Sequence, residues 1–245
     1  MYIATVNSTN DYLRLHPDIV TLRTDFQTSG RGQAGNHWES EQGQNLLFST
    51  RLKEIGLAAT DQWFINMLVA VALYETLNTK LSTLNSTLTI KWPNDLYYGD
   101  KKLAGVLIEN TLLGTHIADS IIGIGLNLNQ TEWHSDAPNP VSLKQITGED
   151  YDPDEIMNMF LTTLAQLMPN MNRIRSDYMQ HLYRREGFYW WEEREVSTMP
   201  TMNGTRTEQS FEAQIVDITP QGELVLQTRN QEIKTYHFKQ IKYIL

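Results

Sequence analysis

The 245-residue chain contains no cysteine, which excludes disulfides, thiolate metal ligands and cysteine nucleophiles. Its most apolar run, residues 64–74 (FINMLVAVALY), is well short of the roughly 20 residues that a membrane-spanning helix needs. The first residues, MYIATVNSTNDY, lack the basic start and apolar centre of a secretory signal. These absences predict a cytoplasmic protein with no membrane partner.

Basic residues are scarce as well. The chain has 20 Lys and Arg residues against 29 Asp and Glu residues, a formal net charge of −9. Such a balance repels nucleic-acid phosphates, so we expect no nucleic-acid binding, although a local basic pocket for a small anion is compatible with it. An apolar fraction of 40% in a chain of this length supports one sizeable core and leaves room for a small second domain.

The first half of the chain alternates between strand and helix signals. Ser8, Thr9, Asn10 and Asp11 form a typical helix start, because hydroxyl and amide side chains cap free N–H groups. Residues 61–81 predict a helix buried on all sides, since they are apolar nearly throughout. Strands are expected at 19–26, 45–51, 88–92 (ended by Pro93) and 116–128, with a β-hairpin at 95–109 turning at Gly99 and Asp100.

The second half changes character near Trp191. Residues 131–148 predict a loop, and a long helix is expected from Asp152 towards Tyr183. Short alternating segments follow at 195–199, 210–218, 223–227 and 233–238, with a turn at Asn203 and Gly204, and they predict a small β-barrel. We therefore expect an α+β catalytic domain over residues 1–190 and a small barrel over 191–245.

The stretch SGRGQAGNHW matches the dinucleotide fingerprint G-x-G-x-x-G at Gly30, Gly32 and Gly35. A dinucleotide site also needs a helix directly after the third glycine, and here a strand-like segment follows instead. Glu54 lies near the spacing of a ribose-binding acid but does not replace the missing helix. No Gly-Lys-Ser/Thr ends the run, so a Walker loop is excluded too. The loop, with Arg31 inside it, is either an anion site or an ordinary surface turn.

Two lysines flank the second informative stretch, KWPNDLYYGDKKLAG. Lys91 ends one strand and Lys102 opens the return strand of the hairpin, whereas Lys101 is expected to face solvent. Lysines at neighbouring strand ends would focus positive potential on one phosphate, with Asp95 holding Mg²⁺ or a ribose.

A third stretch, IIGIGLNLN, places Gly123, Gly125 and Asn127 at the end of a strand. It is either a closely packed strand or a place where a ligand approaches the backbone. The six histidines show neither metal-ligand spacing nor a serine partner in a G-x-S-x-G turn, which disfavours zinc enzymes and serine hydrolases.

Four blocks in this order together resemble the biotin protein ligases: STN at 8–10, QTSGRGQAGNHW at 27–38, KWPNDLYYGDKKLAGVLIE at 91–109 and GIGLNLN at 123–129. The resemblance implies a mixed sheet flanked by helices, related to class II aminoacyl-tRNA synthetases and lipoate ligases, followed by an SH3-like barrel. It also implies a two-step reaction, in which ATP activates biotin as biotinyl-5'-AMP and a lysine of a biotin carboxyl carrier domain then receives the biotin.

The resemblance further implies a role for each matching residue. Lys102, Arg31 and Lys91 are the expected catalytic cations, and the glycine loop is expected to close over biotinyl-AMP. Biotin is expected to contact Ser8, Thr9, Asn10, Gln27, Gly30, Arg31, Gly32, Gln33, Lys102, Gly105 and Gly125. ATP or the adenylate is expected to contact Arg31, Trp38, Lys91, Asn94, Asp95, Lys102 and Asn127, with Asp95 the candidate ligand of Mg²⁺.

The resemblance implies ATP with Mg²⁺ as the co-substrate and no bound redox cofactor. It is also compatible with a homodimer. Gln33 and Asn36 stand where the familiar form of the loop has further arginines. Because the first block begins at Ser8, we expect no preceding helix-turn-helix and no DNA binding. Two alternatives stay open: a lipoate or octanoate ligase of the same fold, and a non-catalytic biotin sensor.

Overall fold

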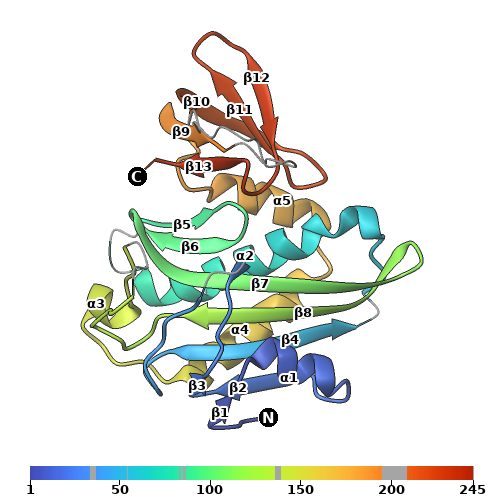
Figure 1. The fold of residues 1–245 in the computed structure, drawn as a ribbon, viewed down its shortest axis with the longest axis vertical. Coiled ribbons are helices and arrows are strands. Elements are labelled where there is room, and N and C mark those ends of the chain that lie inside the picture. Colours follow the sequence, from blue (N-terminus) through green and yellow to red (C-terminus); the bar gives the residue numbers. More distant parts are fainter. Residues whose placement is uncertain are drawn as a thin grey trace, which may run out of the picture.

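A computed structural model of the protein describes residues 1–33, 37–53, 55–82, 84, 87–135, 139–194 and 209–244. Its centre is a six-stranded sheet in the order β2-β4-β8-β7-β6-β5, in which every neighbouring pair runs antiparallel (Figure 1). The strands are β2 (Thr21–Thr24), β4 (Leu46–Lys53), β5 (Leu88–Lys91), β6 (Asp95–Tyr98), β7 (Lys101–Leu113) and β8 (His116–Leu126). A parallel pair, β1 (Thr5–Val6) with β3 (Phe26–Gln27), lies beside it.

Helices cover the two faces of this sheet unequally. The helices α2 (Trp63–Leu81), α4 (Pro153–Leu167) and α5 (Met171–Gln180) lie behind it in Figure 1 and enclose the main apolar core. The short helix α1 (Thr9–Leu15) lies on the front face, over a small cluster that includes Leu13, Leu22 and Ile121. Since α1 spans only part of β4 and β8, the rest of the front face is available for a ligand site.

Most predicted elements of the first half are confirmed, but the single strand expected at 19–26 is instead β2 and β3, which are separated at Asp25 and belong to different sheets. Ser8 caps α1 by accepting a hydrogen bond from the backbone N–H of Asp11. Helix α2 is buried along most of its length, as its continuous apolar sequence predicts. Strand β5 ends directly before Trp92 and Pro93, which are joined by a cis peptide bond.

Two predictions in the second half are wrong. The long helix from Asp152 towards Tyr183 is two helices, α4 and α5, separated at Met168, Pro169 and Asn170. Proline lacks the N–H that the helix ladder needs and its ring clashes with the preceding turn, so Pro169 divides the segment. The loop predicted at 131–148 contains a helix, α3 (Leu143–Thr147), which begins with a capping box between Ser142 and Gln145.

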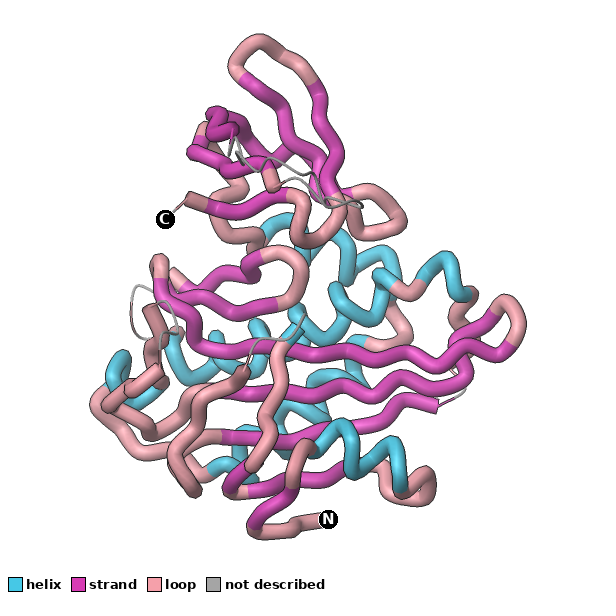
Figure 2. Tube along the Cα trace, in the orientation of Figure 1, coloured by secondary structure: helices cyan, strands magenta, loops and turns pink. Residues whose placement is uncertain are grey.

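A second sheet forms the C-terminal part (Figure 2). Its strands lie in the order β12-β11-β10-β9-β13. Its strands are β9 (Tyr189–Glu193), β10 (Gln209–Ile218), β11 (Leu224–Thr228), β12 (Ile233–Tyr236) and β13 (Ile241–Tyr243). Strands at 210–218, 223–227 and 233–238 were predicted, whereas β9 and β13 were not. The predicted strand at 195–199 and the turn at Asn203 and Gly204 lie outside the described residues, and within those described no pairing joins β12 to β13.

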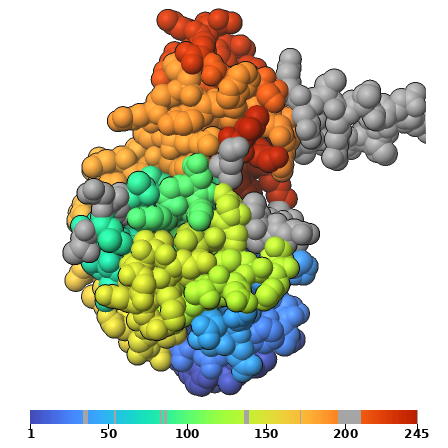
Figure 3. Space-filling model, turned by 90° about the vertical axis from the view of Figure 1, so that its left-hand side faces the viewer, coloured from blue at the N-terminus to red at the C-terminus, as the bar shows by residue number. Residues whose placement is uncertain are grey.

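The C-terminal sheet forms a lobe that rests on the N-terminal part of the chain near β5 and α5 (Figures 1 and 3). Trp92 anchors this contact: its indole Nε1 donates to the carbonyl of Gly222 at 2.9 Å, and its ring packs edge-on against Phe238. A Cβ on Gly222 would lie 2.3 Å from the ring of Trp63, and its φ of +90° also favours glycine. In the described part of the chain, no helix is long and apolar enough to cross a membrane.

Candidate active site

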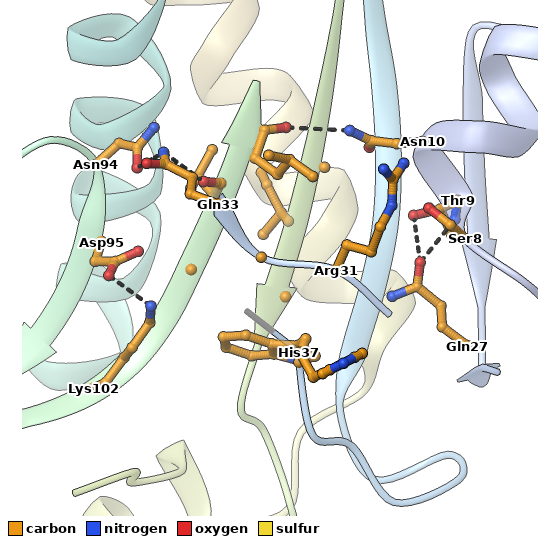
Figure 4. A pocket seen from close by; sticks show the side chains of 18 of the residues that line it. Ser8, Thr9, Asn10, Gln27, Arg31, Gln33, His37, Asn94, Asp95 and Lys102 are labelled. Carbon is orange, nitrogen blue, oxygen red and sulfur yellow. Dashed lines mark hydrogen bonds and ion pairs between the residues drawn. The ribbon is translucent and has the colours of Figure 1, made fainter. Parts of the chain in front are cut away.

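A cavity opens on the front face of the central sheet, between the start of α1 and the β6–β7 hairpin (Figure 4). Strands β7 and β8 form its floor, and the glycine-rich loop lies across it. It is lined by Ser8, Thr9, Asn10, Gln27, Arg31, Gly32, Gln33, His37, Trp38, Pro93, Asn94, Asp95, Lys102, Gly105, Val106, Leu107, Gly123, Ile124, Gly125 and Phe238. The four blocks of the resemblance therefore meet in one place.

Hydroxyl and amide groups gather at the α1 end of the cavity. The β1–β3 pairing places Gln27 beside the first turn of α1. The Oε1 atom of Gln27 accepts hydrogen bonds from the backbone N–H of Thr9 at 2.7 Å and from its hydroxyl at 3.0 Å. Because both donors face Oε1, the Nε2 amide points towards the middle of the cavity (Figure 4).

Asn10 is fixed against the sheet at the same end. Its Nδ2 donates to the carboxylate of Glu109 at 2.8 Å, and its Oδ1 accepts from the hydroxyl of Ser49 at 2.6 Å. A Cβ on Gly123 would lie 2.4 Å from this Oδ1, so only glycine leaves room for Asn10 here.

Trp38 lies over the middle of the floor. Gly105 on β7 and Gly125 on β8 are directly opposite each other in the sheet, which leaves a patch of bare backbone. A Cβ atom would lie 2.9 Å from the Trp38 ring at Gly105 and 2.5 Å from it at Gly125. The glycines in IIGIGLNLN thus allow side chains above the sheet to pack closely against it. These side chains, Asn10 over Gly123 and Trp38 over Gly125, both line the cavity.

The hairpin end of the cavity is charged. The Nζ atom of Lys102 lies 2.6 Å from Oδ2 of Asp95, and both side chains are partly buried. Lys102 also lies 5.7 Å from the centre of the Trp38 ring. Asn94 donates to Asn66 at 2.8 Å, which fixes its own Oδ1 towards the loop residue Gln33.

The glycine-rich loop is attached at both sides of the cavity. Arg31 forms an ion pair of 2.5 Å with Asp11 on α1. Gln33 donates to Asn94 at 3.2 Å and to the carbonyl of Val106 at 3.4 Å on the opposite side. Gly35 and Asn36 lie outside the described residues, and the described residues 37–53 that follow contain strand β4 and no helix.

Three of the expected site residues do not line the cavity. Gly30 directly precedes the lining residue Arg31, and its carbonyl accepts from the backbone N–H of Trp38 at 3.2 Å. Asn127 is buried under the hairpin and donates to the carbonyls of Lys102 and Val141 at 3.3 and 3.0 Å. Both residues therefore support residues that line the cavity or lie beside it.

Lys91 is the third residue outside the lining. Its Nζ donates to the hydroxyl of Tyr97 at 3.0 Å and lies over the rings of Tyr97 and Tyr243, at 4.3 and 4.9 Å from their centres. Burial lowers the pKa of the Lys91 ammonium to about 8, and the nearby carboxylate of Asp95 only partly offsets this effect.

The structure also adds residues that sequence reasoning did not assign to the site. His37, Leu107 and Gly123 belong to segments already singled out. Leu107 and Gly123 lie two residues from Gly105 and Gly125 on the same strands, so alternation places them on the same face, and His37 directly precedes Trp38 in the loop. Phe238 comes from the turn between β12 and β13 and carried no signal, because only the docking of the C-terminal sheet brings it to the cavity.

A metal site of protein ligands alone is not present among the described residues, where no group of three His, Cys, Asp or Glu side chains is clustered. Asp95, the candidate ligand, is instead paired with Lys102. One carboxylate suits Mg²⁺ that arrives with phosphate oxygens, which is the usual manner in which proteins hold it.

The fold and site define an α+β protein with a small-molecule cavity, amide and hydroxyl groups at one end and a lysine at the other. The model of the biotin/lipoate A/B protein ligase family matches residues 4–127, and the chain belongs to this family.

Individual relatives agree with this assignment. The bifunctional ligase/repressor BirA of Bacillus spizizenii is 29% identical over 226 residues, which cover 90% of this chain and 65% of the relative. The biotin–[acetyl-CoA-carboxylase] ligase of Paracoccus denitrificans is 32% identical over 176 residues, covering 67% of this chain and 70% of the relative. The chain thus spans about two thirds of the length of such relatives.

Solved structures show the same fold. The biotin protein ligase from Aquifex aeolicus, in complex with biotin and ATP, superimposes with a TM-score of 0.78 at 21% identity. The similarity covers 100% of this chain and 98% of the other, so the fold assignment includes the C-terminal sheet.

Proposed function

We propose that this protein activates biotin with ATP and attaches it to a lysine of a biotin carboxyl carrier domain. In the first step a biotin carboxylate oxygen attacks the α-phosphorus of ATP. The bond from that phosphorus to the bridging oxygen breaks, and pyrophosphate leaves with the electron pair, giving biotinyl-5'-AMP. In the second step the lysine amine attacks the acyl carbon, and AMP and the amine proton are released.

The observation that supports this proposal best is the division of the cavity into two unlike ends. Thr9 and Gln27 present hydrogen-bonding groups at one end, which suit the cyclic urea of biotin. Lys102 lies at the other end, where the carboxylate and the α-phosphate would meet. Between them, Trp38 and the glycine floor offer an apolar passage for the thioether ring and the alkyl chain.

Charge neutralisation is the chemistry that this site supplies. A carboxylate has an unperturbed pKa near 4–5 and needs no general base at neutral pH. Its approach to a phosphate is opposed by like charge, which the cation of Lys102 reduces in the transition state. Arg31 would add to this effect only after leaving Asp11, with which it pairs at the α1 end. This requirement explains a site that needs neither a catalytic triad nor a thiol.

ATP would occupy the hairpin side, next to Asn94, Asp95 and Lys102. Mg²⁺ would be held mainly by the phosphates, with Asp95 as its one candidate carboxylate ligand, and when bound it would reduce the phosphate charge. The partner is a carrier domain of a biotin-dependent carboxylase. The protein and this partner would meet in the cytoplasm.

ATP–pyrophosphate exchange with a panel of acids tests the first step. Biotin should stimulate exchange, whereas lipoate and octanoate should not. The reverse preference would establish the lipoate-type alternative on the same fold.

Transfer of labelled biotin to a purified carrier domain tests the second step. A protein that binds biotin but neither exchanges pyrophosphate nor labels the carrier would be a sensor. The presence of Lys102 at the cavity favours the enzyme over the sensor.

A further inference from the structure

A buried hydroxyl beneath the α1 end of the cavity has no role in the chemistry above. Ser49 lies on β4 with its side chain towards α1 and is fully buried. Its Oγ lies 2.7 Å from Oγ1 of Thr9 and 2.6 Å from Oδ1 of Asn10, so it contacts two cavity residues without lining the cavity itself.

The donor and acceptor in each of these hydrogen bonds are set by neighbouring groups that can only donate or only accept. The carboxylate of Glu109 only accepts, so it attracts Nδ2 of Asn10 and leaves Oδ1 facing Ser49. The single hydroxyl proton of Ser49 is then shared between two acceptors, Asn10 Oδ1 and Thr9 Oγ1.

The same logic fixes Gln27. The backbone N–H of Thr9 only donates, so it fixes the Oε1 atom of Gln27 towards α1. The Thr9 hydroxyl donates to that same oxygen and, in turn, accepts from Ser49. The Nε2 of Gln27 is therefore left to donate into the cavity. Beside it lies Oγ1 of Thr9, which already donates its own proton to Gln27 and can only accept from a ligand.

We propose that Ser49 is a positioning residue for ligand recognition, acting through Thr9 and Gln27. By holding Thr9 in place, it lets the cavity present a donor, Gln27 Nε2, next to an acceptor, Thr9 Oγ1. A group with a carbonyl adjacent to an N–H complements this pair, and the cyclic urea of biotin is such a group. This inference rests on the proposed function and names the residue that sets its specificity.

Removal of the Ser49 hydroxyl would leave two buried acceptors without their donor. Thr9 and Asn10 are each almost completely buried, so water does not replace the lost bond easily. Thr9 would then be free to rotate, and Gln27 would lose one of the two donors that orient it. Biotin binding should weaken while the hairpin end of the cavity stays intact.

The next residue of the same strand provides a matched control. Thr50 is also buried, but it faces the opposite side of the sheet, where its hydroxyl pairs with that of Thr21 at 2.9 Å. Ser49→Ala and Thr50→Val each remove one buried hydroxyl from β4. Only the first removal should affect recognition.

The experiment measures KM for biotin, KM for ATP and kcat by pyrophosphate exchange, together with the melting temperature. Ser49→Ala should raise KM for biotin roughly tenfold or more, the scale of leaving a buried acceptor unsatisfied. Its KM for ATP and its melting temperature should match those of Thr50→Val. If Ser49→Ala does not fold, Ser49→Cys, which keeps the shape with a weaker donor, takes its place.

A second readout separates recognition from general damage. Iminobiotin carries a C=N–H group in place of the urea carbonyl, so the wild-type protein should bind it less tightly than biotin. Ser49→Ala should reduce this preference several-fold. An unchanged preference, or equal effects of both variants on KM for biotin, would overturn the role of Ser49. Absence of biotin-dependent exchange in the wild-type protein would instead overturn the proposed function.

Discussion

The ammonium group of Lys102 lies 2.6 Å from a carboxylate oxygen of Asp95, across the β6–β7 hairpin. A partly buried charge is costly to leave unpaired, so Asp95 holds Lys102 at the cavity wall before any substrate binds. An arriving carboxylate and phosphate would add to this pair, and the hairpin keeps both partners on neighbouring strands. Pre-positioning of this kind is what electrostatic catalysis requires.

Lys102→Ala should therefore reduce biotin-dependent pyrophosphate exchange by about 100-fold or more, the usual effect of removing one preorganised electrostatic contact. Lys101→Ala is the matched control, because Lys101 is the preceding residue and is exposed. Steady-state exchange rates of the two variants give the comparison. Similar rates for both would show that Lys102 does not act on the reacting groups.

Arg31→Gly should allow biotinyl-AMP to escape from the cavity. Arg31 attaches the glycine-rich loop to α1 through Asp11, and without this ion pair the loop would cover the reactive anhydride less completely. Mass spectrometry should then find biotin on lysines of bystander proteins. Arg194→Gly is the control, since Arg194 is similarly exposed and pairs with Glu192 at 3.6 Å but does not line the cavity. Labelling confined to the carrier domain would contradict the sealing role.

Gly125→Ala should displace Trp38, because a Cβ at this position would lie 2.5 Å from the indole. We expect kcat/KM for biotin to fall at least tenfold and the tryptophan emission to change. A double-mutant cycle with Trp38→Ala checks the mechanism: if the two residues act through one contact, their effects are not additive. Additive effects would show that Gly125→Ala does not act through Trp38.

Lys91 should make stability depend on pH. Its pKa is about 8 in the folded protein and near 10.5 in the unfolded chain, so between these values the unfolded state binds more protons. The free energy of unfolding of the wild type, relative to Lys91→Met, should thus rise with pH over this window, by at most about 3 kcal/mol. Urea titrations from pH 7 to pH 10.5 measure it.

Lys91→Gln serves as a second reference, because it also removes the titrating group but keeps a polar end. It should show the same pH trend against the wild type as Lys91→Met. A difference between wild type and variants that is flat, or that falls with pH, would mean that burial does not lower the Lys91 pKa.

The sequence by itself determined most elements and the chemical character of the site. Some patterns depend only on neighbouring residues and therefore predict structure directly. Examples are the helix cap at Ser8, the continuous apolar run of α2, and the turn at Gly99 and Asp100. Misjudged segments were local as well: the break at Pro169 and the capping box at Ser142 are both visible in the sequence.

Only the tertiary structure decided which residues act together. Ser49 reaches Thr9 and Asn10 from 40 and 39 residues away, and Phe238 reaches the cavity only because Trp92 anchors the C-terminal sheet. The same is true of Lys91, whose motif predicts a ligand contact but whose side chain lies among tyrosine rings. A local pattern specifies residue types and strand ends, whereas sheet register and the packing of distant segments set which side chains meet.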